Sequence, residues 1–405
     1  MLAVQYLEDG PEVARIPPSE ARARLHRALN LLPISHVLVG WNLPGPLLRA
    51  CAAETAVSGA QLLLWHPLLS GSAALPPRPE WLAIGLDGEP VPAFQRMPEF
   101  TFLCPNRPAV RGAVMRQVED GLSGHDYQGV FFDRIRYPSP TADPGRSLAC
   151  FCDDCHRAAA ADQGLDLQAV GRAVKALTST LEGTLSFVRI LLDPSAPTSE
   201  NPNLALLRRF LDFRAASITR LVRAAADTAR GMGLGVGLDC FSPSLASTVG
   251  QDLGALDRNC DWIKVMTYGH TLAPAGFPFE LLNLADWLVR HKAIERSEIL
   301  GWLSGASGLP LRATPEALRE DGLTPEALAS EVRRGRLAGV RTLLAGTELV
   351  EIEGGTRLRP EQITADLAAF RSAGADGLVL SWDLWRIPHE RLELVRRSWP
   401  ASRVA

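Results

Sequence analysis

The chain has 405 residues, of which 46% are hydrophobic and 21% charged, and its formal net charge at pH 7 is −3. This composition is close to the average of globular proteins, which argues against general disorder and allows a large core. The small net charge gives no electrostatic reason to expect a nucleic acid or an anionic membrane as partner.

The N-terminal sequence MLAVQYLEDG places acidic residues where a secretory signal would need an apolar stretch. No run approaches the ~18 consecutive apolar residues that a membrane-spanning helix requires. We therefore expect a cytoplasmic protein with no membrane partner.

Eight short apolar runs, each ending in polar or aromatic residues, follow one another along the chain. Their apolar stretches are nearly continuous rather than alternating, which is typical of parallel strands covered on both faces. The runs are residues 36–42, 61–66, 100–106, 128–138, 234–243, 261–270, 340–350 and 376–385.

Helical patterns lie between these runs. Residues 204–230 repeat apolar side chains at three- and four-residue spacing up to Gly231, and residues 360–374 also end on a glycine. Thr324 followed by proline is typical of a helix start. Strands alternating with helices predict a (β/α)₈ TIM barrel. A doubly wound open sheet is the alternative, but no glycine-rich nucleotide-binding turn follows any strand.

Three segments interrupt the regular alternation. Residues 81–91 contain an Asp-Gly turn and predict an inserted hairpin, and residues 298–305 are interpreted as helix rather than as a ninth strand. Residues 139–233 are too long for a single crossover helix, and their loop at 193–203 is the segment we expect to be most flexible. We therefore predict one TIM-barrel domain over residues 1–405, with a helical insertion at 139–233.

The C-terminal ends of the strands of such a barrel meet at one mouth. The residues there are rich in carboxylates, aromatic rings and hydrogen-bonding groups. They are Trp41, Asn42, Trp65, His66, Asn106, Asp133, Arg136, Tyr137, Asp239, Tyr268, His270, Glu348, Trp382 and Asp383. Aromatic faces stack on sugar rings, and glycosidic cleavage needs two carboxyl groups. The set predicts a glycoside hydrolase that acts on an oligosaccharide or polysaccharide.

Three carboxylates are the catalytic candidates. Asp133 emerges directly from an apolar strand, although it could instead form only a salt bridge with Arg136. Asp239 has the same position on the following strand, with a hydrogen bond to loop backbone as its alternative role. Glu348 ends a later strand, where further acidic residues also fit a solvated edge. The predicted substrate-binding residues are Trp41, Trp65, Asn106, Arg136, Tyr268, His270, Trp382 and Asp383.

Seven cysteines are an odd number, and most are scattered, which argues against a disulfide framework. Cys150, Cys152 and Cys155 form a CxCxxC cluster, and Cys104 would become the fourth ligand of a tetrahedral zinc if the two loops fold together. Four thiolates would make this zinc structural, and reduced cysteines without a metal are the alternative. Nothing in the sequence indicates an organic cofactor.

The segments FFDRIRYP, VGLDCFSP, GQDL, DWIKVMTYG and GLVLSWDL follow one another in this order. Together they resemble TIM-barrel families that are assigned to the glycoside hydrolases largely by fold and whose fourth strand ends in D-x-I-R-[FY]-P. The resemblance extends from about residue 100 to residue 388, and the FDRIRYP motif is its most specific part. It implies a TIM barrel with a functional carboxylate at Asp133.

The cysteine pattern separately resembles that of zinc-bearing β-galactosidases, in which a cysteine after the third strand joins a CxCxxC cluster to hold zinc. In their clan an Asn-Glu pair on the fourth strand supplies the acid/base, and a glutamate on the seventh strand is the nucleophile. Glu348 matches the latter by position. The fourth strand departs from the pattern, because it has Asp133 between Phe132 and Arg134.

The partner of Asp133 is therefore open among Asp239, Glu348 and Asp383. Two other classes of function also remain open. One is a carbohydrate-binding barrel without catalysis, and the other is a barrel hydrolase or lyase that acts on something other than a sugar.

Overall fold

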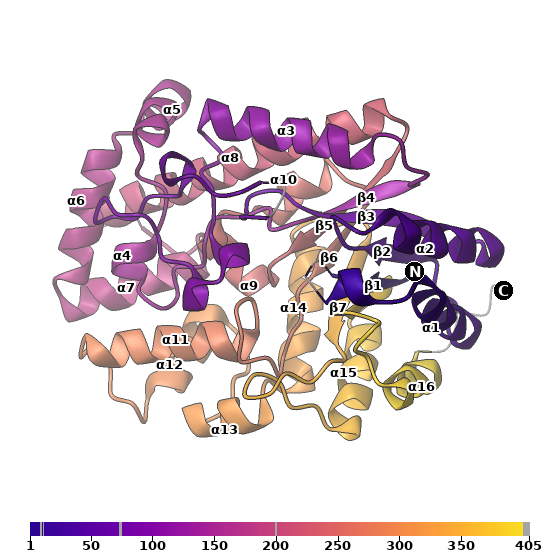
Figure 1. Ribbon diagram of the computed structural model, residues 1–405. Coiled ribbons are helices and arrows are strands. Elements are labelled where there is room, and N and C mark those ends of the chain that lie inside the picture. The colour runs from indigo at the N-terminus through magenta and orange to yellow at the C-terminus, as the bar shows by residue number, and fades with distance from the viewer. Residues whose placement is uncertain (9, 11, 73–74, 199–200, 400–405) are drawn as a thin grey trace.

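The computed structural model describes residues 1–8, 10, 12–72, 75–198 and 201–399. Eight parallel strands form a closed barrel in chain order, with the first strand paired to the last (Figure 1). The predicted (β/α)₈ TIM barrel is confirmed. The strands are β1 (Leu2–Tyr6), β2 (His36–Val39), β3 (Gln61–Pro67), β4 (Gly129–Asp133), β5 (Gly235–Cys240), β6 (Trp262–Val265), β7 (Leu343–Glu348) and β8 (Gly377–Ser381).

One predicted strand is wrong, and one barrel strand was not predicted. Residues 100–106 lie on the long connection after β3, where Phe102 and Leu103 form only isolated antiparallel bridges. The missing strand is β1, which pairs with both β2 and β8. Its apolar run is short and contains Gln5, which is buried inside the barrel rather than exposed as its polarity suggests.

The helices cover the outside of the barrel (Figure 1). The α-helices are α1 (Pro18–Leu31), α2 (Gly45–Ser58), α3 (Pro108–Leu122), α4 (Pro144–Ser147), α5 (Asp153–Gln163), α6 (Leu167–Thr178), α7 (Leu181–Leu192), α8 (Pro202–Gly231), α9 (Pro243–Ala246), α10 (Leu253–Asp257), α11 (Phe277–Arg290), α12 (Ile299–Ser307), α13 (Pro315–Asp321), α14 (Pro325–Leu337), α15 (Pro360–Ser372) and α16 (His389–Ser398). Short 3₁₀ helices span Val13–Arg15, Pro79–Trp81, Phe94–Arg96, Pro98–Phe100 and Ser247–Val249. No helix in the described part of the chain is long and apolar enough to cross a bilayer.

The predicted helices and the inserted hairpin are confirmed. The 204–230 pattern corresponds to α8, and residues 298–305 begin α12 as a helix. The Thr324 hydroxyl caps α14 by accepting a hydrogen bond from the Ala327 amide at 3.2 Å. A bridge between Ile84 and Pro90 closes the predicted hairpin.

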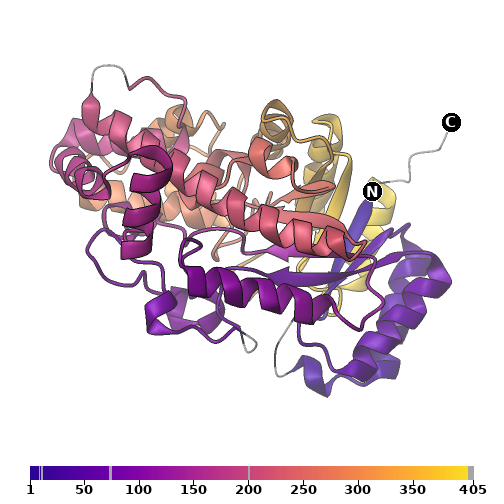
Figure 2. The ribbon, with the colours of Figure 1, turned by 90° about the horizontal axis from the view of Figure 1, so that it is seen from above.

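A long helical region, α4 to α8, separates β4 from β5. Helices α5 to α7 lie on the side of the molecule opposite α1, α2 and α16 (Figures 1 and 2). The expectation of a flexible loop at 193–203 falls partly outside the described residues, because the structure does not describe 199 and 200.

Arg214 of α8 joins this helical region to the rest of the molecule. Its guanidinium is fully buried and donates hydrogen bonds to the carbonyl of Ala149 and, at 3.0 Å, to that of Thr248. It also lies 4.8 Å from the ring centroid of Tyr137. A buried cation is tolerated only when its donors are paired, so these contacts fix three segments against one another.

An apolar cluster fills much of the barrel interior. Its side chains are Ala3, Leu38, Trp41, Leu63, Trp65, Phe131, Trp262, Leu344 and Val379. Phe131 stacks on Trp262 with ring centroids 5.1 Å apart. Gly237 leaves the space for this indole, since a Cβ there would lie 2.3 Å from Trp262. The cluster reaches the mouth at Trp65, whose indole contacts Asp133.

Candidate active site and cysteine cluster

Asp133 and Asp239 lie side by side at the carboxyl ends of β4 and β5. The register pairs Phe132 with Leu238, so the two aspartates that follow are neighbours across the sheet, at a strand spacing of ~5 Å. Both share the inner face with Phe131, because side chains alternate along a strand. Asp133 is 6% and Asp239 3% exposed.

Asp133 is held by two donors. The Trp65 indole Nε1 donates to Oδ2 at 3.0 Å, and the Arg134 amide donates to Oδ1. These two contacts fix the orientation of the Asp133 carboxyl group.

Arg136 makes no ion pair with Asp133 in the described structure, so that alternative for Asp133 is wrong. Its guanidinium lies between the rings of Phe102 and Phe241, 4.3 and 4.6 Å from their centroids. Nη1 donates to the Tyr137 carbonyl at 3.2 Å, and Nε has no partner among the described residues. Burial lowers the pKa of Arg136 to about 10, although nearby carboxylates oppose this.

Asp239 forms a buried ion pair with Lys264 of β6. Lys264 Nζ lies 2.9 Å from Asp239 Oδ2, and the lysine has no exposed surface. Burial raises the pKa of Asp239 to about 7, with Lys264 opposing the rise and Asp133 adding to it. Oδ1 receives no hydrogen bond from the part of the chain that the structure describes.

A chain of hydrogen bonds extends this ion pair across the barrel. Lys264 Nζ also donates to Gln5 Oε1 at 3.3 Å, and the Ser381 hydroxyl donates to the same oxygen at 2.7 Å. The Tyr268 hydroxyl donates to Ser381 at 3.2 Å. Sequence patterns did not single out Lys264 or Gln5, because both lie within apolar strands. Their only signal is a charged or polar residue inside an otherwise apolar run.

Glu348 belongs to a separate group at the end of β7. Its carboxylate accepts hydrogen bonds from the His270 amide and the Thr271 hydroxyl. Burial raises its pKa to about 7. The His270 ring points to α15, with Nε2 at 2.8 Å from Asp366 Oδ2. This group joins the loops after β6 and β7 to α15. Both oxygens of Glu348 accept hydrogen bonds, whereas Asp366 Oδ1 has no partner among the described residues.

Asp383 connects the ends of β8 and β1. Its Oδ1 accepts hydrogen bonds from the amides of Leu7 at 2.8 Å and Trp385 at 2.9 Å. Burial raises the pKa of Asp383, and these amides oppose the rise. These contacts give the Asp383 carboxylate a structural role where the first and last strands of the barrel meet.

The aromatic residues predicted to bind sugar differ in exposure. Trp41 and Trp65 are 7% and 2% exposed and pack edge to face at 5.5 Å. The Arg134 guanidinium lies 5.2 Å from the Trp41 ring centroid. Trp382 is partly exposed and contacts Tyr268, with ring centroids 5.0 Å apart. Trp382 is therefore the most accessible of the three indole rings.

Glu8, after β1, was missed because its strand was not recognised. Its side chain is 37% exposed, and Oε1 lies 3.7 Å from Arg134 Nη2. Withdrawal from water raises the pKa of Glu8 to about 7; Arg134 opposes the rise, while Asp383 and Asp133 add to it. A carboxylate just beyond a short apolar run is the signal that could have found it.

Three residues predicted for the mouth lie elsewhere. One is Tyr137, whose ring packs against Arg214 and whose hydroxyl accepts a hydrogen bond from Asn106 at 3.4 Å. His66 packs against Phe132 on the outer face of the sheet, and burial lowers its pKa to about 4. Asn106 lies at the cysteine cluster, where Nδ2 donates to Cys155 Sγ at 3.3 Å and to the Ser217 hydroxyl at 3.0 Å. The error arose because residues 100–106 do not form a barrel strand.

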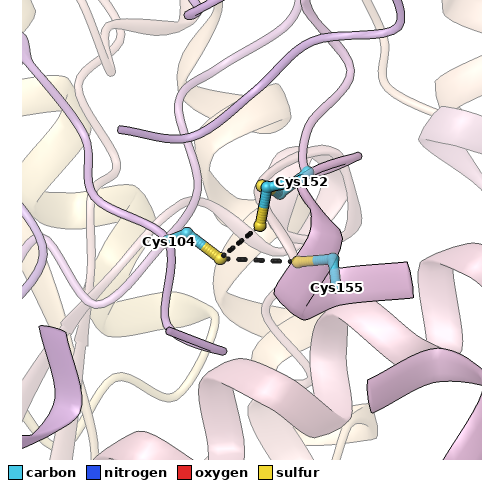
Figure 3. Close-up of side chains that lie close together, drawn as sticks. Cys104, Cys152 and Cys155 are labelled. Carbon is cyan, nitrogen blue, oxygen red and sulfur yellow. Dashed lines mark hydrogen bonds between the residues drawn. The ribbon is translucent and has the colours of Figure 1, made fainter. Parts of the chain in front are cut away.

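The four predicted cysteines form one buried cluster. The sulfur atoms of Cys104, Cys150, Cys152 and Cys155 all lie within 4.8 Å of one another. In Figure 3, Cys152 and Cys155 point toward Cys104, at 3.6 and 3.4 Å. Zinc–sulfur bonds of ~2.3 Å in a tetrahedron imply sulfur separations of ~3.8 Å, so the donor set fits zinc.

Two hydrogen-bond donors and the N-terminus of a helix face the sulfur atoms of the cluster. The Ile84 amide donates to Cys150 Sγ at 3.3 Å, and the Asn106 amide group donates to Cys155. Cys155 also lies in the first turn of α5, where the helix dipole favours negative charge. These features match the way that proteins support metal-binding sulfur.

The sequence matches no protein-family model and no curated protein. Solved structures share the fold. The PgaB (BpsB) glycoside hydrolase domain from Bordetella bronchiseptica is similar over 99% of both chains, with 13% identity and a TM-score of 0.58. The alpha-L-fucosidase isoenzyme 2 from Paenibacillus thiaminolyticus is similar over 98% of this chain and 48% of its own, with 12% identity and a TM-score of 0.51.

Proposed function

We propose that this barrel is a glycoside hydrolase of oligosaccharides or polysaccharides, with Asp133 and Asp239 as its two catalytic carboxyl groups. The adjacency of these carboxyls at the ends of β4 and β5 is the observation that supports the proposal most strongly. Two similar folds belong to proteins named as a glycoside hydrolase and a fucosidase, which is consistent with it.

The surroundings of the two aspartates suggest different roles. Asp133, whose carboxyl group is oriented by two hydrogen bonds, would act as nucleophile or as stabiliser of positive charge at the anomeric carbon. Asp239, whose pKa is raised to about 7, holds a proton near neutrality and serves as general acid. A separation of ~5 Å between the two carboxyl groups would give retention of configuration and one of ~6.5–9.5 Å inversion, so the configuration of the released sugar distinguishes the two mechanisms.

The substrate would approach past the less buried side chains of the mouth. Trp382 is the platform for a sugar ring, with Tyr268 beside it. Arg136 would orient the substrate near the aspartates, because its Nε has no partner among the described residues. Glu348 and His270 support the loops that surround the site.

We also propose that Cys104, Cys150, Cys152 and Cys155 hold a structural zinc. Four thiolates complete a tetrahedral site and leave no position for water or substrate. When bound, the metal would cross-link the connection after β3 to the segment that leads into α5, and the reaction does not involve it.

A screen of the purified protein against oligosaccharides and 4-nitrophenyl glycosides tests this function. We expect hydrolysis by the wild type and its loss in Asp133→Asn, with folding and melting temperature retained. Binding of a glycan without hydrolysis by the wild type would contradict the proposal and indicate a carbohydrate-binding barrel. Hydrolysis that is equally fast in Asp133→Asn would remove this residue from the mechanism.

A further inference from the structure

We propose that Lys264 is a positioning residue of the active site, which holds Oδ2 of Asp239 and leaves Oδ1 to deliver a proton to the leaving group. This inference rests on the proposed glycosidase function and specifies how its acid is oriented. Neither the sequence motifs nor the fold comparisons assign a role to this lysine.

The position of Lys264 is built into the barrel. It is the register partner of Asp239 on the adjacent strand, so the two side chains share the inner face. Its ammonium lies 2.9 Å from Asp239 Oδ2 and 3.3 Å from Gln5 Oε1. Gly346 on the other neighbouring strand clears the space, because a Cβ there would lie 2.6 Å from Lys264 Cε. The ammonium is thus held from two sides.

The two oxygens of Asp239 are in different states. Oδ2 is bound to Lys264, while Oδ1 is buried and has no donor among the described residues. A buried carboxylate oxygen without a donor is unfavourable, which calls for an explanation at this position. A proton on Oδ1, shared with the substrate oxygen, removes the penalty.

Cleavage of the glycosidic bond is coupled to proton transfer from Asp239. The bond between the anomeric carbon and the glycosidic oxygen breaks, its electron pair goes to the oxygen, and that oxygen takes the proton from Asp239 Oδ1. Asp133 donates an electron pair to the anomeric carbon, and water later releases the sugar while returning a proton to Asp239. Lys264 keeps its protons and stabilises the carboxylate that forms on Asp239.

Lys264 is not itself the nucleophile. Burial alone would lower its pKa, but Asp239 and Tyr268 together raise it above its usual value. A lysine that attacks substrate needs the neutral amine, which this environment disfavours. The geometry therefore favours a fixed positive charge beside the acid.

The activity test uses Lys264→Met, with Arg341→Met as matched control. Arg341 pairs with Asp257, another buried carboxylate, at the amino-terminal end of the barrel. Removing Lys264 raises the pKa of Asp239, so the basic limb of the pH–rate profile moves up by about one unit or more. We expect kcat to fall by ~10–100-fold on an oligosaccharide and less on the 4-nitrophenyl glycoside, whose leaving group needs little protonation. Lys264→Arg should restore the pH profile.

A second measurement does not depend on activity. The aspartate carboxyl carbons are labelled with ¹³C and followed by NMR. The Asp239 signal is the one that is absent in Asp239→Asn. Its titration midpoint is then compared between wild type and Lys264→Met. We expect a higher midpoint in the variant and an unchanged one in Arg341→Met. If Lys264→Met does not fold, Lys264→Gln, which keeps an amide donor for Asp239 but removes the charge, replaces it in the same titration.

The outcomes separate the two proposals. A wild type that hydrolyses no glycan contradicts the glycosidase function and with it the catalytic part of this inference, while the titration still decides whether Lys264 controls Asp239. A wild type that is active, with an unchanged midpoint and pH profile in Lys264→Met, overturns the role of Lys264 alone.

Discussion

The cysteine cluster and the barrel mouth are both buried groups of reactive side chains, but they differ in how their polar atoms are satisfied. In the cluster, four sulfur atoms face one another and receive hydrogen bonds from Ile84 and Asn106. At the mouth, Asp239 Oδ1, Arg136 Nε and Trp41 Nε1 are buried without partners among the described residues.

In a closed site, as we use the term, the side chains of the site satisfy one another, whereas in an open site some polar atoms still lack a partner. A closed cluster of four thiolates fills the coordination sphere of its metal and leaves no position for another ligand, as expected of a metal site that stabilises the fold. A mouth with unsatisfied donors and acceptors gains most when a polar ligand enters, as expected of a site that serves binding or catalysis. The following predictions test this contrast.

The largest expected effect lies at the mouth. Asp239→Asn removes the proposed acid, so kcat on an oligosaccharide should fall by ~10³-fold. The melting temperature should fall as well, because the buried Lys264 ammonium loses its carboxylate partner. Steady-state kinetics and thermal unfolding measure the two quantities. Asp257→Asn, which alters a buried carboxylate outside the mouth, is the control and should keep kcat. Equal losses in both variants would mean that the effect is one of stability.

The cysteine cluster should show the opposite pattern. Cys152→Ser leaves three thiolates, so the zinc content should fall from ~1 to below ~0.5 per chain and the melting temperature should decrease. Cys51→Ser changes an equally buried cysteine outside the cluster and should keep the metal. Metal analysis by mass spectrometry decides the matter. Wild-type protein that never contained zinc, without exposure to a chelator, would contradict the closed-site interpretation.

Glu348 should make stability depend on pH. Its folded-state pKa of about 7 lies above the ordinary value of 4.5, so the folded protein binds this proton more tightly than the unfolded chain. This contribution to stability is complete below about pH 4.5 and is lost as the pH rises through 7. Glu348→Gln should reduce that loss by ~1–3 kcal/mol, measured by urea unfolding between pH 5 and pH 8. Glu351→Gln, at a more exposed carboxylate, is the control, and an unchanged slope in Glu348→Gln would refute the assignment.

The smallest effect concerns the support of the cluster. Asn106→Leu removes the donor to Cys155 but no ligand, so zinc affinity should weaken by ~10-fold while one zinc per chain is retained. Competition with a chelator measures this affinity. Asn30→Leu, on the exposed surface of α1, provides the control. An unchanged zinc affinity would mean that Asn106 does not support the cysteine cluster and that its contact with Ser217 is what matters.

The sequence predicted those features that depend on position within a strand. Asp133 and Asp239 end apolar runs, and adjacent strands of a barrel bring such residues together whatever the details of packing. The cysteines were predicted because three lie within six residues of one another. The local pattern does not decide which distant residue completes each set: the partner of Asp133 stays open among Asp239, Glu348 and Asp383, and Cys104 joins the cluster only if two loops fold together.

The features that depend on the register of distant strands could not be predicted. Lys264 contacts Gln5 across the barrel interior, and neither sequence position shows that the two strands face one another. Asn106 was misplaced because its segment was interpreted as a strand. Glu8 was missed together with β1, whose short run includes a polar residue.

The carbonyl contacts of Arg214, which include one to Ser247 at 3.4 Å, have a consequence for how the protein unfolds. If the helix that contains Arg214 detached, the carbonyls of Ala149, Ser247 and Thr248 would lose their donor, so the helical region between β4 and β5 and the barrel should lose structure together. We expect a single calorimetric transition in which this region offers no separate, earlier step. An added cross-link in these helices would then raise the melting temperature of the entire molecule.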